Sequence, residues 1–158
     1  ERPDVLAFET DPLKDDVEVT GEVMTKLWIS STAVDTDFTV KLIDVYPSSE
    51  DYPDGYHLNL VDTIRRARYR DSWTDPEFLT PGQPVEISIA LWPTANVFKK
   101  GHRIRIDVSS SNFPRFDVNP NTGDEIGRHT KMIKAINTVH TSSKFASRVI
   151  IPIIPPED

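Results

Sequence analysis

Apolar and polar residues alternate along several stretches of the chain. The longest run covers residues 17–29, where every second position is apolar or small and the positions between are mostly polar. Because successive side chains of a β-strand point to opposite faces, this run predicts a strand with one buried face. Gly21 interrupts the run and predicts a bulge or bend where the strand passes from one sheet to another.

Similar alternation predicts further strands. In residues 38–45 the phase slips because Ile43 and Val45 are both apolar, which predicts a strand that is buried on both faces or carries a bulge. Residues 64–70 predict a short strand or a helical turn, and residues 94–99 predict one helical turn. The other predicted strands are 5–10, 56–60, 85–91, 103–108, 132–139 and 145–153.

Eight or nine strands with little helix predict an all-β fold. The spacing of the strands favours an antiparallel β-sandwich or jelly roll. A chain of 158 residues is long enough for one hydrophobic core. We therefore expect a single domain over residues 1–158, with its core at about 5–154.

Charge and composition narrow the range of partners. The net charge of −7 argues against nucleic acid as a partner, because a nucleic-acid binder needs a basic face. No apolar run approaches membrane-spanning length, so no membrane partner is expected. Cysteine is absent, which excludes disulfides and thiolate metal sites and favours a cytoplasmic location.

The sequence lacks the common catalytic motifs. A nucleophilic serine elbow needs Gly-x-Ser-x-Gly, whereas Ser109–Ser111 follow a predicted strand without flanking glycines. The four histidines are scattered without metal-ligand spacing, and we expect His140 to be a hydrogen-bonded structural residue. The sequence thus predicts no catalytic residue, no cofactor site and no metal ligand.

Two charged clusters allow alternative interpretations. The acidic loop residues are consistent with a calcium site, although EF-hand spacing is absent and solvation is the simpler explanation. The basic run at 65–70 predicts ion pairs with neighbouring acids, or an interface for an acidic partner. The acidic residues are Asp35, Asp37, Asp51 and Asp54, and the basic ones are Arg65, Arg66, Arg68 and Arg70.

Aromatic residues in loops are the main functional signal. A solvated linker would not carry the two phenylalanines of the segment 112–117, so this loop packs on its own domain or on a partner. Stacking of a carbohydrate on such rings is an alternative, and anchoring on the domain's own core is favoured for Trp92. The candidate contacts with another domain or with a pocket are Trp73, Trp92, Asn112, Phe113, Arg115 and Phe116.

Several motifs together resemble one family. They follow in order over residues 5–154: EVTG at 18–21, KLIDVYP at 41–47, LWPTA at 91–95, SSSNFPRFD at 109–117 and NPNTG at 119–123. They resemble the C-terminal, non-catalytic domain of the X-Pro dipeptidyl-peptidase family of serine hydrolases. That family includes cocaine-esterase-like (CocE/NonD) enzymes, α-amino-acid ester hydrolases and glutaryl-cephalosporin acylase-like proteins.

The resemblance implies a galactose-binding-like jelly roll that follows an α/β-hydrolase domain with a Ser-Asp-His triad and a helical cap. It implies that this domain packs on both of them and helps to enclose the substrate pocket, and that it carries no triad residue. We therefore expect the chain to be a domain cut from a larger hydrolase, inert by itself, with a homodimer as one way to cover its exposed face. An independent carbohydrate-binding module is the alternative.

Overall fold

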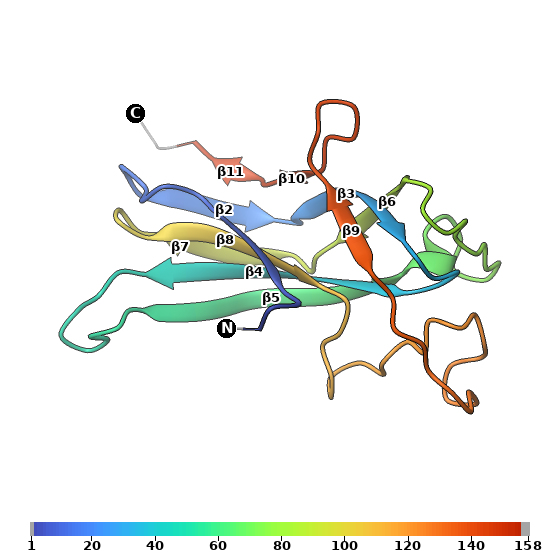
Figure 1. Cartoon of the computed structure of the whole chain (residues 1–158). Coiled ribbons are helices and arrows are strands. Elements are labelled where there is room, and N and C mark those ends of the chain that lie inside the picture. The colour runs from blue at the N-terminus through green and yellow to red at the C-terminus, as the bar shows by residue number, and fades with distance from the viewer. Residues whose placement is uncertain (1, 156–158) are drawn as a thin grey trace.

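The computed structural model describes residues 2–155, which form antiparallel strands and one turn of 3-10 helix, η1 (Ala67–Tyr69) (Figure 1). The strands in chain order are β1 (Leu6–Glu9), β2 (Val17–Gly21), β3 (Met24–Ser31), β4 (Asp37–Tyr46), β5 (Tyr56–Arg66), β6 (Val85–Ala90), β7 (Thr94–Phe98), β8 (Arg103–Ser109), β9 (Asn137–His140), β10 (Arg148–Ile150) and β11 (Ile153–Ile154).

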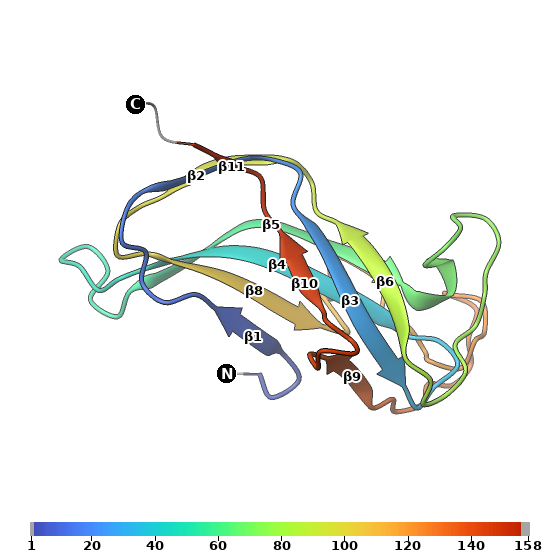
Figure 2. The same cartoon turned by 90° about the horizontal axis from the view of Figure 1, so that it is seen from above.

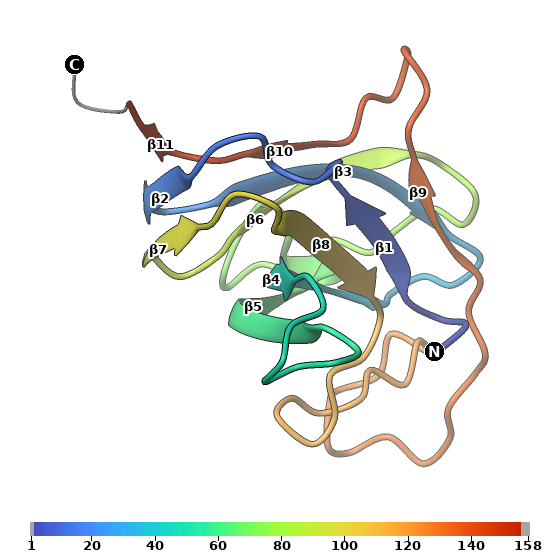
Figure 3. The same ribbon diagram turned by 90° about the vertical axis from the view of Figure 1, so that its left-hand side faces the viewer.

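The strands build two layers. One layer is a four-stranded sheet in the order β1-β8-β4-β5. The other combines a sheet in the order β10-β3-β6, with β9 also paired to β3, and a sheet in the order β11-β2-β7. Figures 1 and 3 show β2 and β3 above β4, β5 and β8, and in Figure 2 β3 crosses in front of β4 and β5. The predicted all-β sandwich is confirmed, with every strand pair antiparallel.

The chain bends at Gly21, as the sequence predicts. β2 ends there and pairs with β7, whereas β3 begins at Met24 and pairs with β6. The φ angle of Gly21 is 132°, a backbone conformation that only glycine adopts readily. A Cβ atom at this position would lie 3.1 Å from Cγ of Pro152, so the bend at Gly21 also lacks room for a side chain.

β4 is a central strand of its sheet and is buried on both faces over most of its length. Its register against β5 shifts between Leu42 and Ile43, where the hydrophobic pattern slips. Leu42 is completely buried and Ile43 is 6% exposed. Both parts of the prediction for residues 38–45 are therefore confirmed.

The core lies between the layers. It uses the inward phase of residues 17–29 and the alternating positions of β6 and β8. Each fully buried aliphatic or aromatic side chain contributes about 1.5–3 kcal/mol relative to an exposed one. The largest fully buried apolar side chains are Phe38, Phe98, Ile29, Leu42, Ile87, Ile89, Leu91, Val19, Val23 and Val40.

Three element predictions were wrong in detail. Residues 94–98 form β7 instead of the helical turn predicted for 94–99, because pairing with β2 buries Phe98 completely. Of the predicted strand 132–139 only residues 137–139 are in a strand, β9, which continues to His140. The predicted strand 145–153 splits into β10 and β11, with Pro152 between them. β10 pairs with β3 and β11 pairs with β2, on either side of the bend at Gly21. Proline has no N–H to donate to a ladder, and it falls where the chain changes sheets.

Residues 64–70 combine both predicted alternatives. β5 continues to Arg66, and η1 follows directly. The split strands and the missed β7 explain why residues 2–155 hold eleven strands and not the eight or nine expected.

Candidate functional site

A long irregular loop projects from one end of the sandwich. It runs over residues 110–136, from the end of β8 to the start of β9, with no helix or strand (Figures 1 and 3). Loops of this length without helix or strand are uncommon in compact domains and are usually either functional or linker segments. Its exposed large apolar side chains are Phe113, Val118, Met132, Ile133 and Ile136.

The first attachment of this loop is Asp62 of β5, which is 4% exposed. Its Oδ2 accepts a hydrogen bond of 2.6 Å from Nδ2 of Asn112, and its Oδ1 forms an ion pair with Arg115. Asn112 and Arg115, both predicted as contacts to another domain, thus bind a buried carboxylate of their own domain. Phe113, between them in the sequence, is 69% exposed.

The second attachment of the loop is Asn119, which is buried. Its Nδ2 donates hydrogen bonds of 2.7 Å to Oδ2 of Asp35 and 2.8 Å to Oδ1 of Asp37. Arg68 approaches the same cluster, because its Nε donates to Oδ2 of Asp35 at 2.8 Å while its Nη2 donates to the carbonyl of Asp124 at 2.9 Å. The loop is thereby fixed to the start of β4 and to η1.

Burial raises the pKa of Asp37 to about 6, and the nearby charge of Asp35 adds to this effect. The hydrogen bond from Asn119 and the charges of Arg66 and Arg68 act in the opposite direction. Nε of Arg66 lies 3.6 Å from Oδ2 of Asp37, and this buried oxygen accepts no hydrogen bond within residues 2–155. Asp37 is therefore a buried carboxylate beneath the loop, with a hydrogen bond from Asn119 to one of its two oxygens.

The four acidic residues considered for calcium do not form one site. Asp35 and Asp37 are buried beside arginines, whereas Asp51 and Asp54 are exposed in the loop at the other end of β4. Within the described residues no group of three or more acidic or histidine side chains is placed to hold a metal ion.

Residues 2–155 also contain no helix long and apolar enough to cross a membrane.

The arginines of residues 65–70 mostly pair with acids of their own domain, as the simpler of the two interpretations expects. Arg65 instead lies over the ring of Trp73, with its guanidinium carbon 3.9 Å from the ring centroid. The ion pairs are Arg66 with Asp37, Arg68 with Asp35, and Arg70 with Asp71 and Glu77.

The other candidate aromatics lie in different surroundings. Trp73 is 82% exposed despite its contact with Arg65. Trp92 is 69% exposed, so the expectation that it anchors on its own core was wrong, and the preceding Leu91 is the residue that is buried. Phe116 is half-buried, with Arg115 over its ring. The six candidates therefore do not form one continuous site.

One serine–histidine pair was not foreseen from the sequence. Oγ of Ser30 lies 2.9 Å from Nε2 of His140, because β9 pairs with β3 in a register that places Trp28 opposite His140. His140 is hydrogen-bonded, as expected, but Ser30 is buried within a strand. The described residues offer no acid hydrogen-bonded to this histidine. Only the strand register, which the sequence does not give, would have revealed the pair.

A separate acid–histidine pair lies in the other layer. Nδ1 of His102 is 2.8 Å from Oδ1 of Asp44, and both side chains are buried. Among the described residues, the serine–histidine pair and the acid–histidine pair thus lie in different layers of the sandwich. A catalytic triad requires a serine, a histidine and an acid joined by hydrogen bonds, and these two pairs do not form one. Ser109, considered from the sequence, is bonded to Oγ1 of Thr39 at 2.6 Å.

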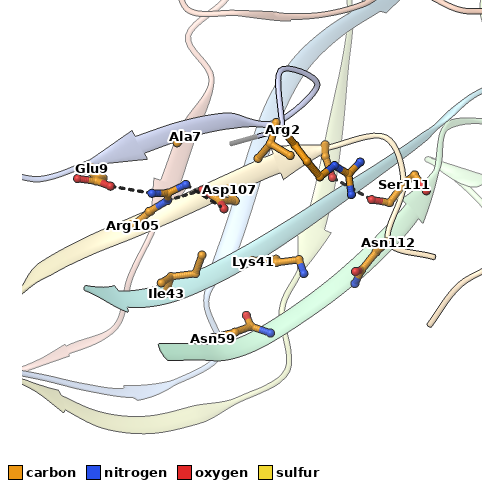
Figure 4. Close-up of a pocket in the computed structure, with 12 residues that line it drawn as sticks. Arg2, Ala7, Glu9, Lys41, Ile43, Asn59, Arg105, Asp107, Ser111 and Asn112 are labelled. Atoms are coloured by element: carbon orange, nitrogen blue, oxygen red, sulfur yellow. Dashed lines mark hydrogen bonds and ion pairs between the residues drawn. The ribbon is translucent and has the colours of Figure 1, made fainter. Parts of the chain in front are cut away.

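A groove of about 650 Å³ crosses the outer face of the sheet β1-β8-β4-β5 (Figure 4). Arg105 lies across it and pairs with Glu9 and Asp107, which satisfies much of the charge within the groove. None of the described residues that line it is aromatic, so the groove offers no ring for stacking on a sugar. The residues that line it are Arg2, Val5, Ala7, Glu9, Lys41, Ile43, Asn59, Arg105, Asp107, Ser109, Ser111 and Asn112.

Comparison with known proteins decides the family. Residues 1–150 match the family described as the X-Pro dipeptidyl-peptidase C-terminal non-catalytic domain. The chain belongs to this family. It is 46% identical over 156 residues to the cocaine esterase of Rhodococcus sp. (strain MB1 Bresler), covering 98% of this chain and 26% of the esterase. The family suggested by the sequence motifs is therefore confirmed.

Solved structures of family relatives have the same fold. An α-amino acid ester hydrolase matches with a TM-score of 0.91 and 36% identity, covering 97% of this chain and 26% of that one. An aminopeptidase from a marine sediment archaeon, Thaumarchaeota archaeon, matches with a TM-score of 0.93 and 34% identity, covering 98% and 26%. The chain thus spans about a quarter of the length of these relatives, and the carbohydrate-binding alternative is not favoured.

Proposed function

We propose that this domain completes an α/β-hydrolase-type serine hydrolase. In this role it packs on the catalytic domain and on the helical cap of the same polypeptide and helps to enclose the substrate pocket. Membership of a family of non-catalytic C-terminal domains supports the proposal, as does the length of its relatives. The domain supplies surface and rigidity, while the acyl-transfer chemistry belongs to the rest of the protein.

The exposed apolar end of the sandwich is the observation that carries the proposal. Monomeric proteins rarely leave large apolar patches in water, and such patches usually mark a contact surface. Here several large apolar side chains are exposed on one loop that is fixed by hydrogen bonds to the buried Asp62 and from the buried Asn119. A fixed loop of this kind is suited to a permanent contact within one chain.

The chemistry of the whole protein is proposed from its relatives. Their names describe hydrolysis of esters and of peptides from the amino end, and both reactions transfer an acyl group to water. An enclosed pocket favours such chemistry, because excluding bulk water strengthens the electrostatic stabilisation of the oxyanion. This domain would contribute to the wall of that pocket without touching the reacting atoms.

Active-site labelling with a fluorophosphonate tests the proposal. The probe should label one serine of the full-length protein, outside this domain, and it should leave the isolated domain unlabelled. Ser30 is the residue to examine in the domain because it has a histidine 2.9 Å away. Stoichiometric labelling of Ser30, lost in Ser30→Ala, would contradict a non-catalytic role. Labelling that is as fast without the domain as with it would contradict a role in completing the pocket.

A further inference from the structure

We propose that Phe113 is the docking anchor by which this domain binds the part of the polypeptide that precedes it in the family, and that Asp62 is the positioning residue that holds Phe113 outward. The inference rests on the proposed function. It adds which surface of the domain makes the contact, which side chain anchors it and which contacts hold that side chain in place.

The presentation of Phe113 is built into the loop. Asn112 precedes it and Arg115 follows two residues later, and both side chains bind the carboxylate of Asp62. The amide of Phe116 also donates to the carbonyl of Asn112 at 3.2 Å, which closes the turn. Two side-chain contacts and one backbone bond therefore hold the short segment from inside, and the ring of Phe113 remains 69% exposed.

Leaving this ring in water is unfavourable unless a partner covers it. Burying an aromatic side chain of this size contributes about 1.5–3 kcal/mol. A segment that is already ordered loses little further entropy when it binds. Aromatic side chains in the centre of an interface commonly dominate its energy. Phe113 combines these properties, because its neighbours are tied down and its own ring is free.

Four other large apolar side chains are exposed on the same loop as the anchor. We call Phe113, Val118, Met132, Ile133 and Ile136 the Phe113 face. Hydrogen bonds join the two halves of the loop, because the amide of Ile133 donates to the carbonyl of Pro120 at 3.0 Å. The amide of Thr32 donates to the carbonyl of Ile136 at 3.1 Å, which ties the end of the loop to the chain just after β3. These bonds fix the later part of the loop, as Asp62 fixes its start.

The position of Arg2 indicates which partner covers the Phe113 face. Arg2 lines the same groove as Ser111 and Asn112, so the chain ahead of β1 runs beside the start of the loop (Figure 4). In the relatives about three quarters of the polypeptide lies outside the matched region, and the family is described as C-terminal. We therefore assign the preceding part of the same polypeptide as the partner of this face.

Trp92 provides a matched control. It is also 69% exposed, but it follows Ala90 of β6, which pairs with Met24 at the start of β3, whereas Ile136 of the Phe113 face bonds Thr32 beyond the other end of β3. A general tendency of exposed aromatics to find partners would affect both residues. A specific anchor affects Phe113 alone.

Site-specific photo-crosslinking in the full-length protein tests the inference. p-Benzoylphenylalanine is placed at position 113 in one variant and at position 92 in the other, and crosslinked peptides are mapped by mass spectrometry. Crosslinks from position 113 to the part of the same polypeptide that precedes residue 2 are expected, with few or none from position 92. Crosslinks from 113 only to a second copy of the protein, or none at all, would overturn the inference.

A second pair of variants tests the clamp. Arg115→Gln removes the ion pair with Asp62, whereas Arg128→Gln removes an exposed ion pair with Glu125 in the same loop. Arg115→Gln should lower the crosslinking yield from position 113 severalfold and should also lower the melting temperature, because the carboxylate of Asp62 is buried and loses its cation. Arg128→Gln should leave both the yield and the melting temperature unchanged. Equal yields in both variants would overturn the role of Asp62.

The outcomes separate this inference from the proposed function. If removal of the domain abolishes hydrolysis but position 113 gives no crosslink to the preceding part, the domain still completes the enzyme and uses another face. If removal of the domain leaves hydrolysis unchanged, the proposed function fails, whatever position 113 contacts.

Discussion

Nε of Arg68 lies 2.8 Å from Oδ2 of Asp35, and both side chains are almost completely buried. This pair joins η1 to the segment just before β4, and the backbone amide of Arg68 also donates to Oδ1 of Asp35 at 3.0 Å. Because Asp35 also accepts a hydrogen bond from Asn119, the pair links the sandwich to the loop 110–136 that carries the Phe113 face.

Arg68→Ala is predicted to destabilise the domain by about 3–5 kcal/mol, because it leaves the buried carboxylate of Asp35 without its cation. Denaturant unfolding of the variant measures this loss. Adding Asp35→Asn should recover part of it, since the uncompensated charge is then gone. Arg128→Ala is the control and should change the free energy of unfolding by less than about 1 kcal/mol, as its ion pair is exposed. A loss in Arg68→Ala no larger than in the control would contradict a structural role for the pair.

The buried carboxylate of Asp37 predicts a pH dependence of stability. Its pKa of about 6 in the folded state lies above the ordinary 3.8, so the folded state binds the proton more tightly than the unfolded state. The contribution of Asp37 to stability is therefore fully present below about pH 4 and is lost as the pH rises through 6. The whole difference corresponds to roughly 3 kcal/mol.

Asp37→Asn should remove this dependence. The variant is predicted to be more stable than the parent at pH 7 and to show a flatter curve between pH 4 and 6.5, because an amide has no charge to bury. The free energy of unfolding, measured at several pH values for both proteins, checks this. A parent whose stability rises through this window, relative to the variant, would show that Arg66 and Arg68 outweigh the burial of Asp37.

Gly21→Ala is predicted to destabilise the domain by about 1–3 kcal/mol, since a φ of 132° strains any residue with a Cβ. The new Cβ would also lie 3.1 Å from the Pro152 ring. Gly82→Ala is a suitable comparison, because Gly82 has a φ of 80° and a Cβ there would meet no atom within 4 Å. Thermal unfolding of both variants compares backbone strain plus the contact with Pro152, in Gly21→Ala, with backbone strain alone, in Gly82→Ala. We expect the larger fall in melting temperature in Gly21→Ala. Equal falls would show that the contact with Pro152 does not destabilise the domain.

Ser30→Ala is predicted to leave the hydrolysis rate of the full-length protein unchanged. Its hydroxyl bonds His140 within the sandwich, and loss of one hydrogen bond should lower the free energy of unfolding by about 1 kcal/mol. Steady-state hydrolysis of an acyl ester and denaturant unfolding measure the two effects. A large fall in turnover number with unchanged stability would contradict the assignment of this pair to structure.

Much of the sandwich was predictable because a strand with one buried face has a period of two. The run through Gly21 and the phase slip at Ile43 each located a real irregularity. The period alone did not locate β7, where burial of Phe98 depends on pairing with β2. The period of two also could not show that Met132 and Ile136 are exposed and lie outside any strand. Alternating apolar residues give the same sequence pattern whether they pack on their own domain or on another one.

The candidate site was less predictable than the fold. The sequence pointed to Asn112, Phe113 and Arg115 as a group, but only the fold places Asp62 beneath them and separates the exposed ring from its two supports. The pairing of Ser30 with His140 likewise depends on strand register across 110 residues of chain. Local patterns carry no information on such long-range neighbours.

Hydrolysis of a p-nitrophenyl acyl ester by three proteins tests most sharply whether this domain completes a hydrolase: the full-length protein, the same protein without this domain, and the isolated domain. We predict turnover by the full-length protein, none by the isolated domain, and a large loss when the domain is removed. Turnover by the isolated domain would contradict a non-catalytic role. Undiminished turnover without the domain would show that it does not complete the enzyme.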